Sequence, residues 1–193
     1  FPFSIAKIAQ LTGSEKSSAG ELANVIRSDA SIATNILKLS NSVFFSSRNR
    51  EIKDVVDAIV RIGFNETKKI ALALAVMNLL DKKEKNFDFD RQQFWYHSLA
   101  TALIAEKLSK SVNYPNPSLA FLTGLLHEFA VLLYDEFFGE IFEVVIEHTT
   151  NEHTTFVDAG IEIIKLDQNE FMAEMFAEWN MPKDLIVGLK GHT

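Results

Sequence analysis

The sequence predicts an all-α protein. Apolar residues recur with the period of a helix in almost every segment, and no segment alternates apolar and polar residues for long. Proline, which interrupts helices, occurs only four times in 193 residues. Because 47% of the residues are hydrophobic, including 16 Phe, the chain can form a substantial core in one large domain or two small lobes.

Capping residues mark the helices in the first half of the chain. Ser18 and Glu21 have the spacing of a capping box, and Asp29 stands where an N-cap would open the next helix. Residues 42–50 are mostly polar and predict a loop. The helices predicted here are 5–11, 18–26, 29–41, 52–62 with Gly63 as a left-handed C-cap, and 70–80 with Asn65 as its N-cap.

A short charged segment, Asp81 to Asn86, is the clearest break in composition. We therefore predict an N-terminal helical lobe over 1–81, a linker over 82–89 and a second helical lobe over 90–193, together forming one domain. The helices predicted in the second lobe are 91–112 with Asp90 as N-cap, 117–137 with Asn116 as N-cap, 139–146, 159–166, 169–180 and a last helix from Pro182.

Composition excludes several functional classes. The net charge is −7 and no basic run is present, which disfavours binding to nucleic acid or to anionic membranes. Without Cys, the chain has no disulfide or thiolate chemistry. The longest apolar run is short and interrupted, so no membrane span is expected. No signal peptide is visible, and a start at Phe1 rather than Met suggests an excised or trimmed chain, with the cytoplasm as the expected compartment.

The predicted helix 117–137 is the centre of the second lobe. It is apolar on nearly every side and should be buried, yet it carries His127 and Glu128 in its middle. Burying these two polar side chains without hydrogen-bond partners would cost roughly several kcal/mol of folding free energy. Their partners therefore decide what the site can do.

His97 is the predicted partner of His127. Thr101 and Ala105 share its helix face, and Gly124 and Ala130 flank His127, so small residues line both helices. The two helices can then approach closely enough for the imidazoles to meet. Either the pair is satisfied by hydrogen bonds in a dry interior, or it ligates a metal together with Glu128.

The metal alternative rests on the spacing from His97 to the His127–Glu128 pair. It resembles the way in which HD-superfamily phosphohydrolases supply their first three ligands to divalent ions that activate a water. A fourth ligand is normally a later Asp, but here Asp135 and Asp158 lie in no evident ligand context. The sequence therefore predicts no bound metal and no other cofactor, with His97, His127 and Glu128 as vestigial ligand candidates.

The chain as a whole resembles the HDOD family, the HD-related output domains of bacterial signalling proteins. The residues that carry the resemblance are Ile26 to Asp29, Ile36 to Ser42 with Phe44, Ile52, Ala58 to Ile59, Ile62 to Gly63, Phe94 to Trp95, His97 to Ser98, Ala120 to Phe121, Gly124 to Glu128 and Trp179 to Pro182. The resemblance implies an N-terminal helical lobe packed on an HD-like lobe. It also implies no hydrolase activity and a role through protein contacts.

Three departures from the family pattern move further from a working metal centre. Glu128 replaces the usual Asp, Lys165 and Gln168 align where a Gly and a His are common, and the C-terminus has only His192. The expected function is thus a non-catalytic regulatory domain that binds signalling proteins, with a homodimer as a further partner. Two alternatives stay open: a divalent-metal phosphohydrolase acting on a nucleotide or cyclic dinucleotide, and a nucleotide sensor without turnover.

Candidates for an interaction surface or pocket lie at the start of the third predicted helix and around its end. They are Asp29, Asn41, Ser42, Phe44 and Phe45. Asp29 and Asn41 also fit structural roles as helix caps. One of the two Phe should pack on the core, which leaves the other free as an anchor for a partner.

Overall fold

The computed structural model describes residues 3–14, 16–45, 51–80 and 89–191. All the regular structure in this part of the chain is helical, which confirms the predicted fold class. The helices are α1 Phe3–Gly13, α2 Ala19–Arg27, α3 Ala30–Ser40, α4 Val55–Ile62, α5 Phe64–Leu80, α6 Arg91–Ser111, α7 Pro117–Leu126, α8 Phe129–Phe137, α9 Gly139–Glu152, α10 Phe156–Ile164, α11 Gln168–Glu178 and α12 Lys183–Lys190.

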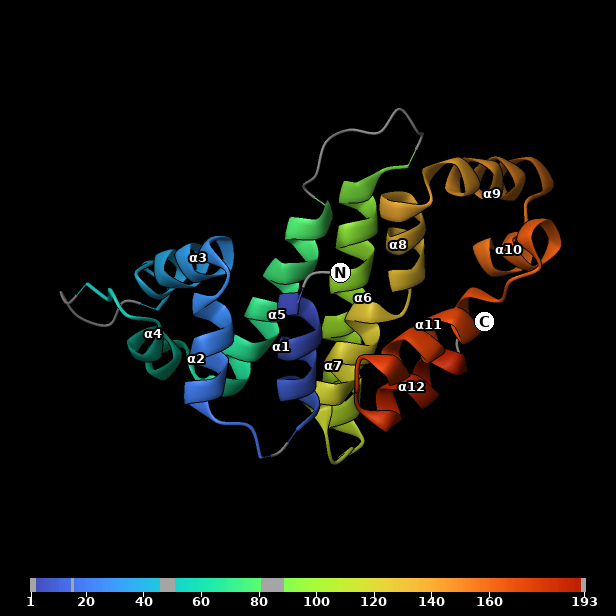
Figure 1. The fold of residues 1–193 in the computed structure, drawn as a ribbon. Coiled ribbons are helices and arrows are strands. Elements are labelled where there is room, and N and C mark those ends of the chain that lie inside the picture. Colours follow the sequence, from blue (N-terminus) through green and yellow to red (C-terminus); the bar gives the residue numbers. More distant parts are fainter. Residues whose placement is uncertain (1–2, 15, 46–50, 81–88, 192–193) are drawn as a thin grey trace.

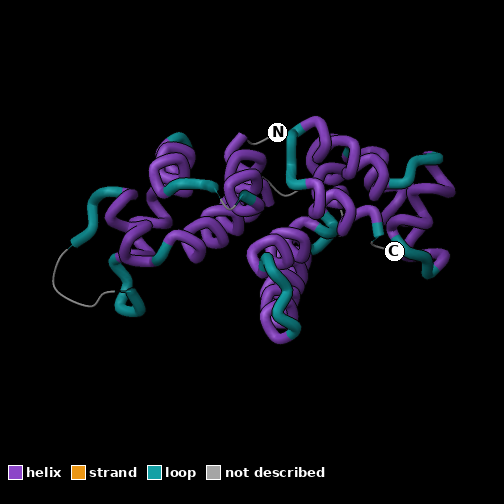
Figure 2. Tube along the Cα trace, turned by 90° about the horizontal axis from the view of Figure 1, so that it is seen from below, coloured by secondary structure: helices purple, strands orange, loops and turns teal. Residues whose placement is uncertain are grey.

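The helices form an elongated molecule with α2 to α4 at one end and α9 to α12 at the other (Figures 1 and 2). Between them, α1 packs on both α5 and α7. One hydrophobic cluster continues from Ile5 in α1 to Leu189 in α12, so the two predicted lobes share a core. Residues 82–88 of the predicted linker lie outside the described residues, and the division into lobes stays a prediction.

Most of the predicted caps are present. Ser18 and Glu21 form the complete capping box, and Asp29 and Asp90 each accept hydrogen bonds from two amides of the following turn. The predicted cap at Asn65 is wrong, because α5 already begins at Phe64. Helix α4 begins at Val55, where the Asp54 side chain accepts from the amide of Val56.

The central helix is the main correction to the predicted fold. The predicted 117–137 helix is broken into α7 and α8 at His127 and Glu128. Among the described residues, the stretch Pro117–Phe137 has the length and composition of a membrane span, contrary to our expectation, but 67% of its most apolar window is buried inside the protein. A buried core segment meets the same criteria, so this finding is weak evidence for a membrane.

The α6–α7 hairpin makes the closest helix contact relevant to the site. A Cβ built on Gly124 of α7 would lie 2.8 Å from Cα and 2.9 Å from N of Ala102 in α6. Real Cβ atoms essentially never lie that near to backbone atoms. The prediction that small residues bring these helices together is therefore confirmed at Gly124.

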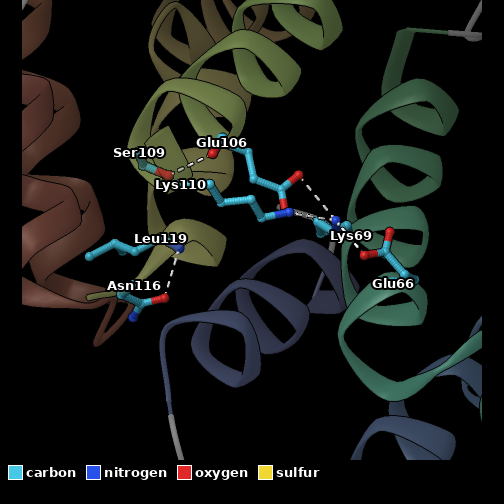
Figure 3. Close-up of polar contacts among 7 residues, drawn as sticks. All are labelled: Glu66, Lys69, Glu106, Ser109, Lys110, Asn116 and Leu119. Carbon is cyan, nitrogen blue, oxygen red and sulfur yellow. Dashed lines mark hydrogen bonds and ion pairs between the residues drawn. The ribbon is translucent and has the colours of Figure 1, made fainter. Parts of the chain in front are cut away.

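A buried ion-pair network joins α5 to α6 across the two predicted lobes (Figure 3). Lys69 contacts Glu106 at 2.9 Å and Glu66 at 2.8 Å, and Lys110 also reaches Glu106 at 2.8 Å. Burial on its own would lower the pKa of Lys69, but its hydrogen bonds to Glu66 and Glu106 raise that pKa above its ordinary value. The network thus holds a charged lysine inside the interface between α5 and α6.

Candidate functional site

The two histidines meet as the sequence predicts. His97 comes from α6, and His127 lies at the break between α7 and α8. Their Nε2 atoms are 3.0 Å apart, and Nε2 of His97 is 3.4 Å from Oε2 of Glu128. The break in the helix matters here, because it places His127 and Glu128 in a turn rather than on successive faces of one helix.

The hydrogen-bond partners indicate which ring nitrogen of each neutral imidazole carries its proton. Nδ1 of His127 lies 2.9 Å from the backbone oxygen of Gly124, and a carbonyl oxygen can only accept. In neutral His127 the proton therefore sits on Nδ1 and Nε2 carries a lone pair. Nε2 of His97 must then donate to Nε2 of His127, with the Glu128 carboxylate beside the same proton.

Burial differs between the two imidazoles. The side chain of His127 is 8% exposed, but that of His97 is 54% exposed and that of Glu128 36%. The expectation of a dry interior is therefore wrong for His97, which lies at the surface. The site is open to solvent from the His97 side.

These three side chains could also hold a metal ion. One ligand atom from each lies within 4.8 Å of the others. Imidazole nitrogens bind zinc at about 2.1 Å, so two of them on one tetrahedral ion lie about 3.4 Å apart, somewhat more than the 3.0 Å between the two Nε2 atoms here. Ligation would require His97 to move its proton from Nε2 to Nδ1.

No fourth protein ligand joins this group within the described residues. Asp135 is buried and paired with Arg91, and Asp158 accepts a hydrogen bond from Thr155 at the start of α10. Gln168 stands near His127 in the wall of a cavity of about 220 Å³, but its amide is a poor metal ligand compared with imidazole. Of the C-terminal positions, His192 lies outside the described residues.

Lys165 has a feature that fits its alignment with a family glycine. Its backbone is left-handed, with φ 55°, where it ends α10. Glycine adopts this conformation at no steric cost. A glycine, which the family resemblance places at this position, would fit the turn without strain.

A groove of about 580 Å³ runs from the histidine pair along α6 and α7 to α12. Its wall is mainly apolar, with hydroxyl groups from Thr101, Ser109 and Thr123 and one carboxylate from Asp184. Sequence reasoning missed this groove, because α12 lies far along the chain and only the fold brings Asp184 and Gly188 to it. A groove of this size can enclose a small molecule.

Among the interaction candidates, Asp29 and Asn41 have structural tasks. Asp29 caps α3, and Asn41 ends it with a right-handed rather than left-handed backbone. The Asn41 amide donates to the backbone oxygens of Leu37 and Ile52 and accepts from the amide of Ile52 at 2.8 Å. Asn41 therefore fastens the chain after residue 51 to the end of α3.

We expect Asn41→Ala to lower the free energy of unfolding by about 2 kcal/mol, because the partly buried backbone groups of Ile52 lose their partners. Urea denaturation measures the change. Asn41→Asp is the matched control: it keeps the acceptor for the Ile52 amide and should recover part of the loss. An Asn41→Ala variant as stable as the wild type would contradict this role.

Phe44 and Phe45 divide as predicted. Phe45 packs against the core, whereas Phe44 is 87% exposed and the neighbouring Val43 96% exposed. Their rings meet edge to face with centroids 4.8 Å apart. Ser42 is partly buried beside them, and the role of these residues in binding a partner stays a prediction.

Comparison with known families decides the assignment. A model described as the HDOD domain matches the chain over residues 1–193. The chain belongs to the HDOD family. The resemblance noted in the sequence is thereby confirmed.

Solved structures share the fold of this HDOD domain. An HDOD domain protein of unknown function from Geobacter sulfurreducens has a TM-score of 0.78 at 22% identity, covering 98% of this chain and 62% of its own. A Marinobacter aquaeolei VT8 protein, named as a candidate signal transduction protein, has a TM-score of 0.75 at 24% identity, covering 98% of this chain and 42% of its own. A Shewanella amazonensis SB2B protein, named as a candidate phosphohydrolase, has a TM-score of 0.72 at 23% identity, covering 98% of this chain and 66% of its own.

One curated relative also matches this HDOD domain. It is an uncharacterized protein from Treponema pallidum (strain Nichols), 24% identical over 182 residues. The match covers 89% of this chain but only 33% of that protein. The chain thus spans about a third of that relative, and at these identities the likeness to the solved structures shows the fold alone.

Proposed function

We propose that this HDOD domain is a non-catalytic regulatory module that acts through protein contacts in bacterial signalling. The observation that carries the proposal is the mutual hydrogen bond of His97 and His127. The proton of His97 Nε2 occupies the lone pair that His127 would offer a metal. The family's signalling role supports the same interpretation.

Exposed apolar residues on α6 support the second half of the proposal, contact with a protein. A stripe at helical spacing follows the exposed face of this helix, formed by Tyr96, Leu103, Ile104 and Leu108, and it continues to Val112 just after the helix. Each of these side chains is at least half exposed. A protein partner, or a second copy of the chain, would remove this apolar area from water.

Metal analysis tests the non-catalytic role. We expect purified protein incubated with Mn²⁺, Fe²⁺, Mg²⁺ or Zn²⁺ and then dialysed to hold no stoichiometric metal. We also expect turnover of phosphodiester and nucleotide substrates to match a His127→Ala control. The proposal would be contradicted if the wild type bound one equivalent of metal and turned over a substrate, and if both His97→Ala and His127→Ala lost the metal.

A divalent-metal phosphohydrolase is the second candidate, favoured by one observation. Two imidazoles and one glutamate with an open side are also the donor set of single-zinc hydrolases, in which a water completes the coordination. The 54% exposure of the His97 side chain leaves room for such a water. The metal analysis above separates the two candidates directly.

The groove beside the histidine pair supports a variant of the regulatory role, in which the domain binds a nucleotide without cleaving it. Its volume of about 580 Å³ suits a small ligand, and Asp184 and Thr123 offer polar contacts. A thermal shift that follows nucleotide concentration by mass action, without turnover, would support it. Val187→Ala, a change at an exposed residue outside the groove wall, serves as the control and should leave the shift intact.

A further inference from the structure

Lys68 on α5 is a buried lysine that has no counter-charge among the described residues. Only 4% of the residue is exposed. Its Nζ donates to the backbone oxygen of Leu11 at 3.2 Å and lies 4.6 Å from the centroid of the Phe64 ring. No carboxylate contacts it within the described part of the chain. An ammonium group carries more donors than this one hydrogen bond uses, so Lys68 can bind a further acceptor.

The next residue on the same helix, Lys69, shows how a buried lysine charge is compensated in this protein. Lys69 is buried to a similar degree, at 7% exposed, but is paired with Glu66 and Glu106. For Lys68, burial lowers the pKa and nothing opposes it. Burying a charge without a partner costs folding free energy. The comparison of the two lysines therefore suggests that an anion binds beside Lys68 and not beside Lys69.

A polar cavity of about 500 Å³ opens beside Lys68. Its wall comes from the end of α1 with Ser14, from the start of α5 with Asn65, and from the turn that opens α7 with Ser118. The side chains of Asn65 and Ser118 make no hydrogen bond to the described residues, so both can donate to a ligand. These elements come from both predicted lobes.

The start of α7 adds positive potential to the same wall. Asn116 caps this helix through the amide of Leu119 at 3.1 Å, and Pro117 has no N–H, so the amide of Ser118 is left to face a ligand. Helix N-termini attract anions because their dipoles and free amides point outward. The helix end is secondary here, since the buried charge of Lys68 is what demands an anion.

We propose that this cavity binds a phosphate group, free or carried on a small metabolite, through Lys68, Asn65 and Ser118. Lysine is a common phosphate ligand, and phosphate offers enough oxygens for all three donors. The cavity lies at the opposite end of α7 from His127, about 15 Å away at the helical rise. The proposal therefore goes beyond the regulatory function and does not depend on it. A bound phosphate would connect α1 and α5 to α7 across the predicted lobes.

Calorimetry and thermal denaturation of the full chain test the site with inorganic phosphate and, separately, AMP. Sodium chloride at equal ionic strength controls for screening. We expect saturable binding and a melting temperature that rises with ligand concentration by mass action. Lys68→Met should abolish both, while Lys53→Met, at a side chain that is 79% exposed, should leave them unchanged.

Stability without ligand gives a second readout. Lys68→Met removes the uncompensated charge while keeping the length of the side chain, so its melting temperature without phosphate should equal or exceed that of the wild type. Should this variant not fold, Asn65→Ala, at an exposed residue, is expected to weaken phosphate binding several-fold with the fold intact. Glu15 follows Ser14 in the sequence and lies outside the described residues, so Glu15→Gln is included and should bind phosphate at least as well as the wild type.

The binding experiments distinguish a site for free phosphate from a site for a phosphorylated metabolite, and both from the absence of a site. Binding of inorganic phosphate that depends on Lys68 supports a site for free phosphate, and Lys68-dependent binding of AMP alone supports a phosphate carried on a nucleoside. The proposal is overturned if neither ligand binds, if Lys68→Met binds as well as the wild type, or if Glu15→Gln abolishes binding.

Discussion

Gly124→Ala is expected to lower the free energy of unfolding by about 3 kcal/mol, measured by urea denaturation. The added methyl would lie 2.8 Å from Cα of Ala102, well inside the usual contact distance of about 3.5–4.0 Å. The atoms it meets belong to the backbone of α6, which can yield only if the two helices move apart. The small gain of alanine over glycine in helix propensity, about 1 kcal/mol, does not offset this.

The same substitution should also disturb the histidine pair. Gly124 supplies the backbone oxygen that fixes the Nδ1 proton of His127, and α6 carries His97. We expect histidine NMR signals of the folded variant to show loss of the shared proton between the two Nε2 atoms.

Gly20→Ala is the matched control for this prediction. A Cβ at Gly20 in α2 would meet only the Ser18 hydroxyl at 4.0 Å. Without a clash, the better helix propensity of alanine should stabilise the protein by about 0.5–1 kcal/mol. If Gly124→Ala were no less stable than Gly20→Ala, the contact between α6 and α7 would be looser than the structure has it.

The α6–α7 hairpin also shows how far sequence alone reaches. Helical periodicity and the caps at Asp29, Asp90 and Asn116 predicted the helices, because these signals act within a few residues. The small residues at Gly124 and Thr101 predicted that His97 and His127 would meet. These inferences needed only local patterns and one assumption about which helix faces pack.

The features that the sequence did not predict depend on contacts between distant segments. The break at His127–Glu128 is hidden by an apolar pattern that continues from α7 into α8, so periodicity predicts one helix there. The exposure of His97 depends on what covers α6, and the groove depends on where α12 returns to α7. Lys69 and Glu106 are unremarkable charged residues in the sequence, yet the fold buries both.

Glu106→Gln is the second prediction with a large expected effect. It removes the charge that Lys69 and Lys110 share but keeps the size of the side chain. Removing one member of a buried ion pair typically costs about 3–5 kcal/mol, and we expect about 3 kcal/mol because Glu66 still contacts Lys69 at 2.8 Å. Urea denaturation at pH 7 provides the measurement.

Asp54→Asn is the matched control, a carboxylate-to-amide change at an exposed ion pair. Asp54 and Arg27 are 44–51% exposed and 2.7 Å apart, and an Asn can still cap α4 as Asp54 does. We expect a much smaller loss of stability there, since solvent screens the pair. Equal losses in the two variants would mean that burial adds nothing to the Glu106 pair.

The pH dependence of the Glu106→Gln effect gives a sharper test. Burial on its own would raise the pKa of Glu106, but hydrogen bonds from Lys110 and Lys69 outweigh it and hold that pKa below its ordinary value. Folding then favours the charged form, so the stabilisation is present above the ordinary glutamate pKa of about 4.3 and is lost as pH falls through the lower folded value. The stability difference between wild type and Glu106→Gln should therefore be constant near neutral pH and shrink in acid. A difference that persists unchanged at low pH would show that packing, rather than the charge on Glu106, holds α5 against α6.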